Sequence, residues 1–466
     1  MKRLNILFTA AALCAAAVCA SAAENAAEQT ASSGSKKKLK SEIVDHLKNN
    51  YRFYGFIRTY MPFDTRESTA GTGDLYYWVP KDNAWNEDKS QDLNERGSFH
   101  MLSITSRLGV DISGYWIGDN EFGGRIETDF YAGLTGNTGT AQLRLRQAYL
   151  TINWHNPDDE RYSINFKAGQ AWHPMAADLP DVFALDSGAP FGPFSRTPLM
   201  TADFNLGKSF SLTAAAIWQM QYTSMGPSAF DSKTGRPTAA ASSADYIKYG
   251  IVPEFYFGVN YRTGGFLARA GIDISTIKPR NTGVVNGVTM KVKDRKTSVL
   301  GFVYAQYTKN LFKLKAKTVY GGSGEQMNLM SGYAVCNISG DNSLWEYAPI
   351  NTSSTWMTIA YGQKVQGSVL LGYVKNLGTS KEVVGEGDKA DANCIFFQKN
   401  GSPNINQMYR IEPGIAYNVG RFTVGLEYML TAVQYGDKSY NRHALSTENL
   451  HWVANNRIEG ILRFTF

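Results

Sequence analysis

The chain has 466 residues, of which 43% are hydrophobic, 13% aromatic and 19% charged, and its formal net charge is +6. A charge this small does not indicate a nucleic-acid-binding protein. No stretch after the N-terminus approaches the roughly 20 consecutive apolar residues that a transmembrane helix needs. A barrel strand hides its apolar face by alternation, so the mean hydropathy of −0.29 excludes neither a membrane barrel nor a secreted β protein.

The N-terminus has the pattern of a secretory signal peptide over residues 1–22. Two basic residues precede an apolar run over residues 4–18, and residues 20–22 (Ala-Ser-Ala) fit the small-residue cleavage site. Residues 23–50 form an Ala/Glu/Ser-rich leader that we expect to end in a short amphipathic helix. We interpret this leader as a flexible periplasmic tether, with contact to the cell wall as the alternative.

From Tyr51 onward the sequence predicts sixteen β-strands, most of them about 9 to 11 residues long or slightly longer, the length that crosses a membrane at a tilt. Long connections follow the odd-numbered strands and short turns follow the even-numbered ones. This alternation with an even strand count predicts an all-β fold, a 16-stranded antiparallel transmembrane β-barrel over residues 51–466. The predicted strands are 51–61, 99–112, 122–134, 142–153, 162–171, 198–207, 209–220, 249–262, 265–277, 297–308, 311–320, 353–362, 366–377, 405–418, 421–434 and 453–466.

The alternation within strands indicates which face meets lipid. In the last ten residues Arg457, Glu459 and Arg463 share one face, and apolar side chains up to the terminal Phe466 share the other. Three lysines alternate with apolar residues in the same way in the predicted strand 311–320. Because a lysine at the lipid midplane costs roughly 2 to 4 kcal/mol, the charged face must line the interior.

Aromatic residues separate a membrane barrel from a soluble one. They flank three of the predicted short turns on the outward face, where an interfacial belt would place them. A soluble barrel has no reason to carry an aromatic ring at one rim, so this pattern favours the membrane. The ring residues are Tyr261, Phe266, Tyr307, Phe312, Tyr417 and Phe422, with Phe53 and Phe466.

The third predicted outer loop, residues 172–197, differs from an exposed mobile loop. It contains Phe183, Leu185, Phe191 and Phe194 and four prolines that stiffen it. We expect this loop to fold into the barrel and to narrow a channel that sixteen strands would otherwise leave open. The charged residues predicted at this constriction are Asp178, Asp181, Asp186 and Arg196.

Basic residues at inward positions of five strands, all within the contiguous run of strands 16 and 1 to 5, form a predicted wall opposite this acidic loop. Together the wall and the loop would set up a transverse field that sorts charged solutes. The alternative is that several of these arginines pair with Asp111, Glu127 and Asp129. The wall residues are Arg58, Arg107, Arg144, Arg146, Lys167 and Arg457.

Five motifs occur in the order of the first strands: residues 54–58 (YGFIR), 106–111 (SRLGVD), 146–150 (RQAYL), 167–172 (KAGQAW) and 196–198 (RTP). In this order they resemble the DcaP-like branch of the trimeric porins of Gram-negative outer membranes. The resemblance covers approximately the whole predicted barrel and is densest in its first third.

The resemblance implies a homotrimer in the outer membrane, a third loop folded inward and a preference for small anions. Two features depart from the pattern. The leader is too short for the long periplasmic coiled coil that this family can carry, and the Pro-Glu-Phe-Gly-Gly loop motif of the general porins is missing. These departures leave trimerisation and substrate preference open.

Other reactive residues are few. Cys336 and Cys394 fall in the sixth and seventh outer loops, where we expect a disulfide rather than two free thiols. The spacing of His443, Glu448 and His451 matches neither a metal site nor a hydrolase. We therefore expect no metal, no cofactor and no enzymatic activity.

The sequence thus predicts a passive porin whose partners are outer-membrane lipid and small hydrophilic solutes. The alternatives are a substrate-specific channel, a structural barrel linked to the cell wall through residues 24–50, and a barrel enzyme. The enzyme is disfavoured because no histidine falls in the middle of a predicted strand.

Overall fold

The computed structural model describes residues 49–71, 76–131, 141–159, 161–185, 187–322 and 324–466. The predicted signal peptide (1–22) and the predicted leader (23–50), except for its last two residues, lie outside this part of the chain. No helix among the described residues has the length and apolar character needed to cross a membrane.

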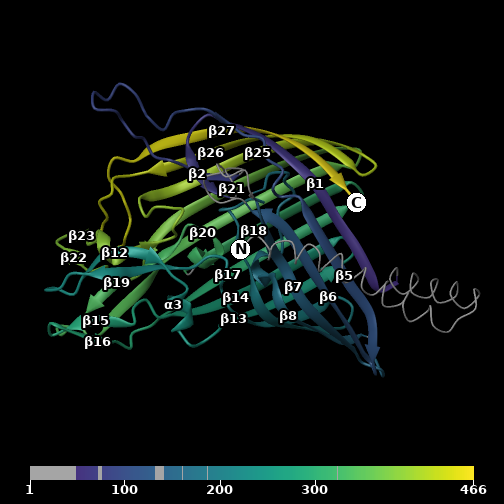
Figure 1. The fold of residues 1–466 in the computed structure, drawn as a ribbon, viewed down its shortest axis with the longest axis horizontal. Coiled ribbons are helices and arrows are strands. Elements are labelled where there is room, and N and C mark those ends of the chain that lie inside the picture. The colour runs from purple at the N-terminus through teal and green to yellow at the C-terminus, as the bar shows by residue number, and fades with distance from the viewer. Residues whose placement is uncertain (1–48, 72–75, 132–140, 160, 186, 323) are drawn as a thin grey trace, which may run out of the picture.

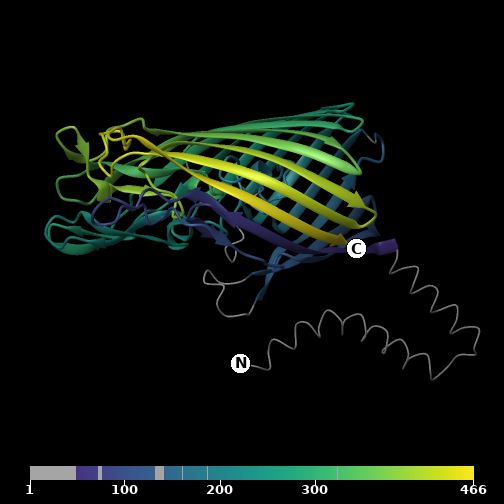
Figure 2. The same cartoon turned by 90° about the horizontal axis from the view of Figure 1, so that it is seen from above.

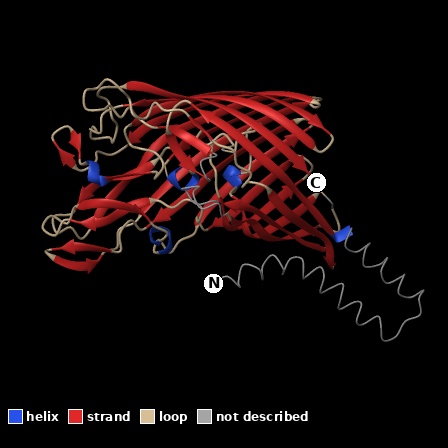
Figure 3. Ribbon diagram, turned by 45° about the horizontal axis from the view of Figure 1, so that its top comes forward, coloured by secondary structure: helices blue, strands red, loops and turns tan. Residues whose placement is uncertain are grey.

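Within the described residues, nineteen strands form one closed antiparallel sheet, in which β1 pairs with β27 to complete the ring (Figure 1). Sixteen of these strands build the barrel wall, which Figure 3 shows in red, and three short ones add pairings at one end. The wall strands are β1 (Tyr51–Asp64), β5 (Arg107–Ile117), β6 (Asn120–Tyr131), β7 (Gln142–His155), β8 (Tyr162–Trp172), β9 (Arg196–Leu206), β10 (Phe210–Ile217), β13 (Glu254–Thr263), β14 (Phe266–Ile277), β17 (Lys296–Lys309), β18 (Phe312–Gly321), β20 (Trp345–Gly362), β21 (Val365–Thr379), β25 (Ile405–Val419), β26 (Phe422–Tyr435) and β27 (His451–Thr465).

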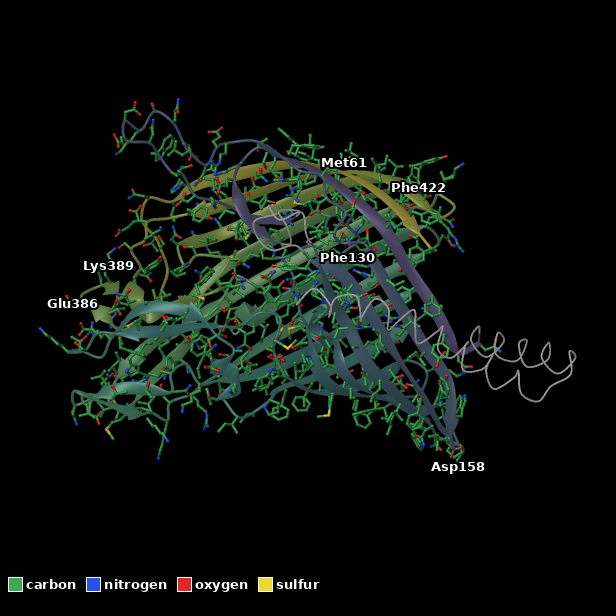
Figure 4. All side chains as sticks on the ribbon, viewed as in Figure 1. Met61, Phe130, Asp158, Glu386, Lys389 and Phe422 are labelled. Atoms are coloured by element: carbon green, nitrogen blue, oxygen red, sulfur yellow. The ribbon has the colours of Figure 1, made fainter. Side chains whose placement is uncertain are left out.

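The remaining elements lie in the long connections. Figure 2 shows these connections at one end of the barrel and tight turns at the end where the C-terminus lies. In Figure 4, Asp158 and Phe422 mark the turn end, and Glu386 and Lys389 mark the loop end. The loop elements are β2 (Ser68–Gly71), β3 (Tyr76–Pro80), β4 (Ser98–Phe99), η1 (Pro174–Ala176), β11 (Met225–Phe230), β12 (Pro237–Ser242), α3 (Asp245–Lys248), β15 (Thr282–Val285), β16 (Val288–Lys291), η2 (Gly324–Met327), β19 (Gly332–Ile338), β22 (Gly385–Glu386), β23 (Lys389–Ala390), η3 (Ala392–Cys394) and β24 (Ile395–Phe397).

The predicted number, order and direction of the strands are confirmed, and the largest boundary errors have local causes. The predicted strand 99–112 begins at Arg107 and continues to Ile117. Gly114 adopts φ +78° inside a β-bulge that shifts the register between Ile112 and Tyr115, and the strand continues past this bulge. β20 begins at Trp345, earlier than predicted, because its first residues pair with β19 in the preceding loop.

The polarity of the wall is inverted relative to a soluble barrel. Apolar residues such as Ile57, Leu108 and Leu426 are 58%, 55% and 53% exposed on the outer face. Lys317, in the strand that carries the alternating lysines, is 1% exposed and donates to backbone oxygens inside the barrel. Charged groups therefore line the interior and apolar groups face outward, which is the arrangement of a membrane barrel.

The predicted aromatic ring lies at the turn end. Phe266 is directly opposite Tyr307 on the neighbouring strand, and Phe422 is opposite Phe464. Phe53 is 67% exposed, and most other members of the ring are exposed as well. Aromatic side chains in such a belt fix the level at which the barrel meets the membrane interface.

The C-terminal residue closes the ring of strands. The backbone N–H of Phe466 donates to the carbonyl of Gly55 at 3.0 Å, and its C=O accepts the N–H of Gly55 at 3.2 Å. The Phe466 ring lies over Gly55, where a Cβ atom would be 2.6 Å from the ring carbon Cζ. Glycine at position 55 thus provides the space that the terminal aromatic side chain occupies.

Candidate functional site: the charged interior of the barrel

Three predicted wall arginines form ion pairs with carboxylates of β6. Arg144 lies opposite Asp129 and donates to both of its oxygens at 2.8 and 2.9 Å. Arg146 donates to Glu127 at 2.8 Å and to Asp129 at 2.6 Å. Arg107 is 3.5 Å from Glu127. The alternative that several wall arginines pair with nearby acids therefore describes this part of the interior.

Arg146 reaches two carboxylates because β7 has a bulge. The register between β6 and β7 shifts after Glu127, so that Gln147 stands opposite Glu127 and Arg146 is the extra residue. Both side chains are buried, and Gln147 also donates to Glu127 at 3.3 Å. A bulge commonly redirects a side chain in this way, and here it gathers donors on one carboxylate.

The other wall residues divide into two kinds. Arg457 is paired with Asp64 at 3.0 Å and with Glu459 at 3.2 Å. Within the described ranges, neither Arg58 nor Lys167 forms an ion pair with a carboxylate. Arg58 bonds to Thr105 and lies over aromatic rings, and Lys167 lies 5.1 Å from the centre of the Tyr149 ring.

Arg196, predicted as a loop residue, is the first residue of β9. It is 5% exposed, and its guanidinium lies over the rings of Trp172 and Phe194, 5.1 and 5.6 Å from their centres. No carboxylate of the described chain pairs with it. Together with Arg58 and Lys167 it leaves an excess of positive charge on the side of the barrel formed by β1 to β9.

The acidic residues of the third loop contact basic side chains of strands β14 and β18. Asp178 is 3.0 Å from Arg269 of β14. Asp181 is 3.0 Å from Lys315 and 3.4 Å from Lys313, both on β18. The third predicted loop carboxylate, Asp186, lies outside the described residues.

Backbone groups of residues 173–195 bond to strands beyond β18. Glu427 of β26 accepts hydrogen bonds from the N–H groups of Phe183 and Ala184. Arg410 of β25 donates to the carbonyl of Ala189 at 3.2 Å, and Ser354 of β20 donates to that of Phe191 at 2.8 Å. Figure 1 places β20, β25 and β26 together in the green to yellow part of the wall.

Glycines let the aromatic side chains of this region approach closely. Phe191 packs on Gly372 of β21, where an added Cβ would lie 2.5 Å from the ring. Gly192 packs against Trp356 of β20, and its Cβ would lie 2.5 Å from the indole nitrogen. Both contacts are too close for any side chain at the glycine position.

The interior also contains a polar cavity of about 760 Å³, which is lined by successive wall strands from β6 to β14. Its lining includes Lys167, Arg125 and Arg269 as well as Asp203, with asparagine and serine side chains around them. Arg125 and Arg269 are paired with Asp111 and Asp178, respectively. A space of this size and polarity suits a small hydrophilic solute with its water shell.

Sequence reasoning missed the wall residues that contact the third loop. Arg269, Arg410 and Glu427 were not predicted as site residues, although all three stand at inward positions of alternating strands. Their alternation was a usable signal for orientation. Their loop partners could not be found in this way, because those contacts join positions 91 to 244 residues apart in the chain.

The predicted disulfide is absent, since Cys336 and Cys394 are free thiols in the structure. The register of β19 and β24 sets Ala334 opposite Ile395, so Cys394 falls beside Val335, one residue away from Cys336. Cys394 is the last residue of η3, and Cys336 lies where the pairing of β19 with β20 shifts its register, so neither thiol belongs to a regular cross-strand pair. Cys394 is buried, and the Sγ of Cys336 lies 3.9 Å from the carbonyl oxygen of Lys381.

No family model and no curated protein sequence matches the chain. Its fold is similar to that of the outer-membrane channel DcaP of Acinetobacter baumannii, with 16% identity, a TM-score of 0.57 and coverage of 89% of this chain and 97% of that one. OmpT of Vibrio cholerae gives 12% identity, a TM-score of 0.47 and coverage of 89% and 97%. OmpF of Salmonella typhi gives 13%, 0.45 and coverage of 90% and 98%. The similarity to DcaP shows that this 16-stranded barrel has the fold of a porin-like outer-membrane channel.

Proposed function

We propose that the protein is a porin of a Gram-negative outer membrane, a passive channel for small hydrophilic solutes rather than an enzyme. The single observation that supports this most strongly is the inverted wall, in which ionisable side chains surround the interior while apolar ones face outward. Sixteen strands enclose a bore wide enough for water and small solutes.

In this proposal residues 173–195 fold into the bore and form its constriction. Support comes from their contacts with β14, β18, β20, β25 and β26, which together span the wall opposite the two strands that the segment connects. Ion pairs through Asp178 and Asp181 hold one part of the segment, and Glu427 and Arg410 hold another. A loop fixed at so many points sets a constant pore width.

A preference for small anions is the finer part of the proposal. Arg58, Lys167 and Arg196 keep positive charges without a described carboxylate partner, whereas Asp178 and Asp181 are neutralised by basic groups of the wall. Interior groups of one sign raise the local concentration of solutes of the opposite sign. A channel specific for one substrate is the second candidate, since the cavity beside Lys167 could select for shape.

Conductance across a planar lipid bilayer tests the channel itself. We expect stepwise, ohmic conductance from the purified protein, and its absence after verified folding contradicts the proposal. In a salt gradient, replacing Arg58 or Lys167 by Gln should move the reversal potential toward that of a cation channel. Lys381→Gln is the matched control, because Lys381 is an exposed loop residue paired with Glu346.

Assembly is proposed separately. We expect a homotrimer, which the molecular mass of the detergent-solubilised protein tests directly. The alternative of a structural barrel assigns cell-wall attachment to residues 24–50. Removal of residues 24–48 should leave conductance unchanged, and loss of peptidoglycan binding in the same variant would support that alternative.

A further inference from the structure

The start of the third loop is held by a buried cluster of three titratable groups. His173, the first residue after β8, contacts Glu254 of β13 with Nε2 at 2.8 Å and Asp273 of β14 at 3.5 Å. All three residues are at most 6% exposed, and one ligand atom from each lies within 4.8 Å of the others. Neither carboxylate oxygen of Asp273 accepts a hydrogen bond from the described residues. A buried acid in this state needs either a proton or a cation.

The hydrogen bonds of His173 determine where its own proton lies. Nδ1 accepts the backbone N–H of Met175 at 3.1 Å, which caps the helix η1. Nδ1 is therefore unprotonated, and a neutral imidazole must carry its hydrogen on Nε2. Nε2 donates this hydrogen to Glu254. Its lone pair is not available to a metal ion, although the spacing of the three ligand atoms would suit one.

The basic side chains around the cluster already have other partners, either carboxylates or backbone carbonyls. On β14, Arg269 is bound to Asp178; on β17, Lys296 is bound to Glu325; on β18, Lys317 donates to the carbonyls of Met175 and Asp178. Tyr256 of β13 lies opposite Asp273, and Gln219 donates to Glu254 at 3.1 Å. No lysine or arginine of the described chain forms an ion pair with Glu254 or Asp273, so His173 cannot balance two ionised carboxylates in this geometry.

We propose that Glu254 and Asp273 bind one proton between them and that this protonated pair clamps the root of the third loop to the barrel wall. Two carboxylates this close in a buried site do not both ionise readily. With one proton, the pair has a single negative charge that accepts the Nε2–H of His173. Loss of the proton at alkaline pH places two like charges beside each other, and their repulsion loosens the attachment of residues 173–175.

Infrared spectroscopy tests the proton without any need for channel activity. Purified protein near neutral pH should show the C=O stretch of a protonated carboxyl group, and Asp273→Asn should remove it. Asp203→Asn is the matched control, because Asp203 is also an interior acid but accepts a hydrogen bond from Thr213. If Asp273→Asn fails to fold, Glu254→Gln replaces it and should abolish the shared-proton band as well. A wild-type spectrum without such a band overturns the proposal.

Metal analysis and single-channel recording complete the test. A stoichiometric metal ion that is lost in Asp273→Asn would show a cation in place of the proton and overturn the proposal. In bilayers, raising the pH should increase the frequency of conductance fluctuations in the wild type and in Asp203→Asn but not in Asp273→Asn. The same pH profile in all three proteins contradicts the clamp. The bilayer measurement rests on the proposed channel function. A protein that does not conduct but keeps the infrared band contradicts that function and leaves the shared proton in place.

Discussion

The two sides of the barrel interior satisfy their charges in different ways. On the side of β6 and β7, Arg144 and Arg146 pair with Asp129 and Glu127 of the adjacent strand. On the side of β14 to β26, the charged groups bind the third loop, as Lys315 does with Asp181. The first set belongs to the wall alone, and the second set couples the wall to the segment that we propose as the constriction. Substitutions should therefore affect stability on the first side and pore width on the second.

The largest expected effect is at Glu427. Its carboxylate is 1% exposed and receives the backbone N–H groups of Phe183 and Ala184, the latter at 2.7 Å. In Glu427→Gln the lost charge and the misplaced amide N–H should weaken the attachment by about 3 kcal/mol, the scale of buried hydrogen bonds to a charged group. We expect a higher mean conductance and faster proteolysis within residues 173–195.

Glu127→Gln is the counterpart on the other side. Glu127 is also buried and receives Arg146 and Gln147, but among the described residues it forms no hydrogen bond or ion pair with the third loop. We expect a lower temperature of unfolding with unchanged conductance. Equal conductance changes in Glu427→Gln and Glu127→Gln would remove the distinction between the two sides.

Glycine at position 372 allows a second test. An alanine Cβ there would lie 2.5 Å from the Phe191 ring, so Gly372→Ala should displace residues near Phe191 and cost about 1 to 3 kcal/mol, as overpacking usually does. At Gly367 on the same strand an added Cβ would meet no atom within 4 Å, so Gly367→Ala is the matched control. Altered conductance only in Gly372→Ala would confirm that β21 positions the loop, while identical traces for both variants would argue against it.

The same contrast explains what the sequence could predict. Arg144 and Asp129 are directly opposite on consecutive strands and only 15 residues apart in the chain, so the alternation of side chains was enough to suggest their pairing. Asp181 and Lys315 are 134 residues apart, and only the closed ring brings them together. The prediction for the two cysteines was wrong as well, because Cys336 and Cys394 lie in different outer loops and the sequence does not set how these loops meet.

A double-mutant cycle on Asp181 and Lys315 measures how strongly this ion pair couples the third loop to the wall. We expect this coupling to be weaker than the attachment through Glu427. Both side chains are partly accessible, with 17% and 15% exposure, so water screens the pair and we expect a coupling of about 0.5 to 1 kcal/mol. Stability of the single and double alanine variants gives this value. The pair Lys381 and Glu346, which lies in the exposed loops, should show a smaller coupling. A smaller coupling energy for Asp181 and Lys315 than for Lys381 and Glu346 would mean that Asp181 does not hold the loop.

The smallest effect concerns the outer loops, where free thiols replace the predicted disulfide. Burial raises the pKa of the Cys394 thiol to about 12 and that of Cys336 to about 11. A higher pKa leaves less thiolate at neutral pH, so both cysteines should react slowly with a maleimide, and Cys394 should react more slowly than Cys336. Mass spectrometry of the labelled protein, before and after treatment with a reductant, distinguishes the two states. Labelling that requires the reductant would show that the two sulfur atoms are joined, and it would contradict the free thiols of the structure.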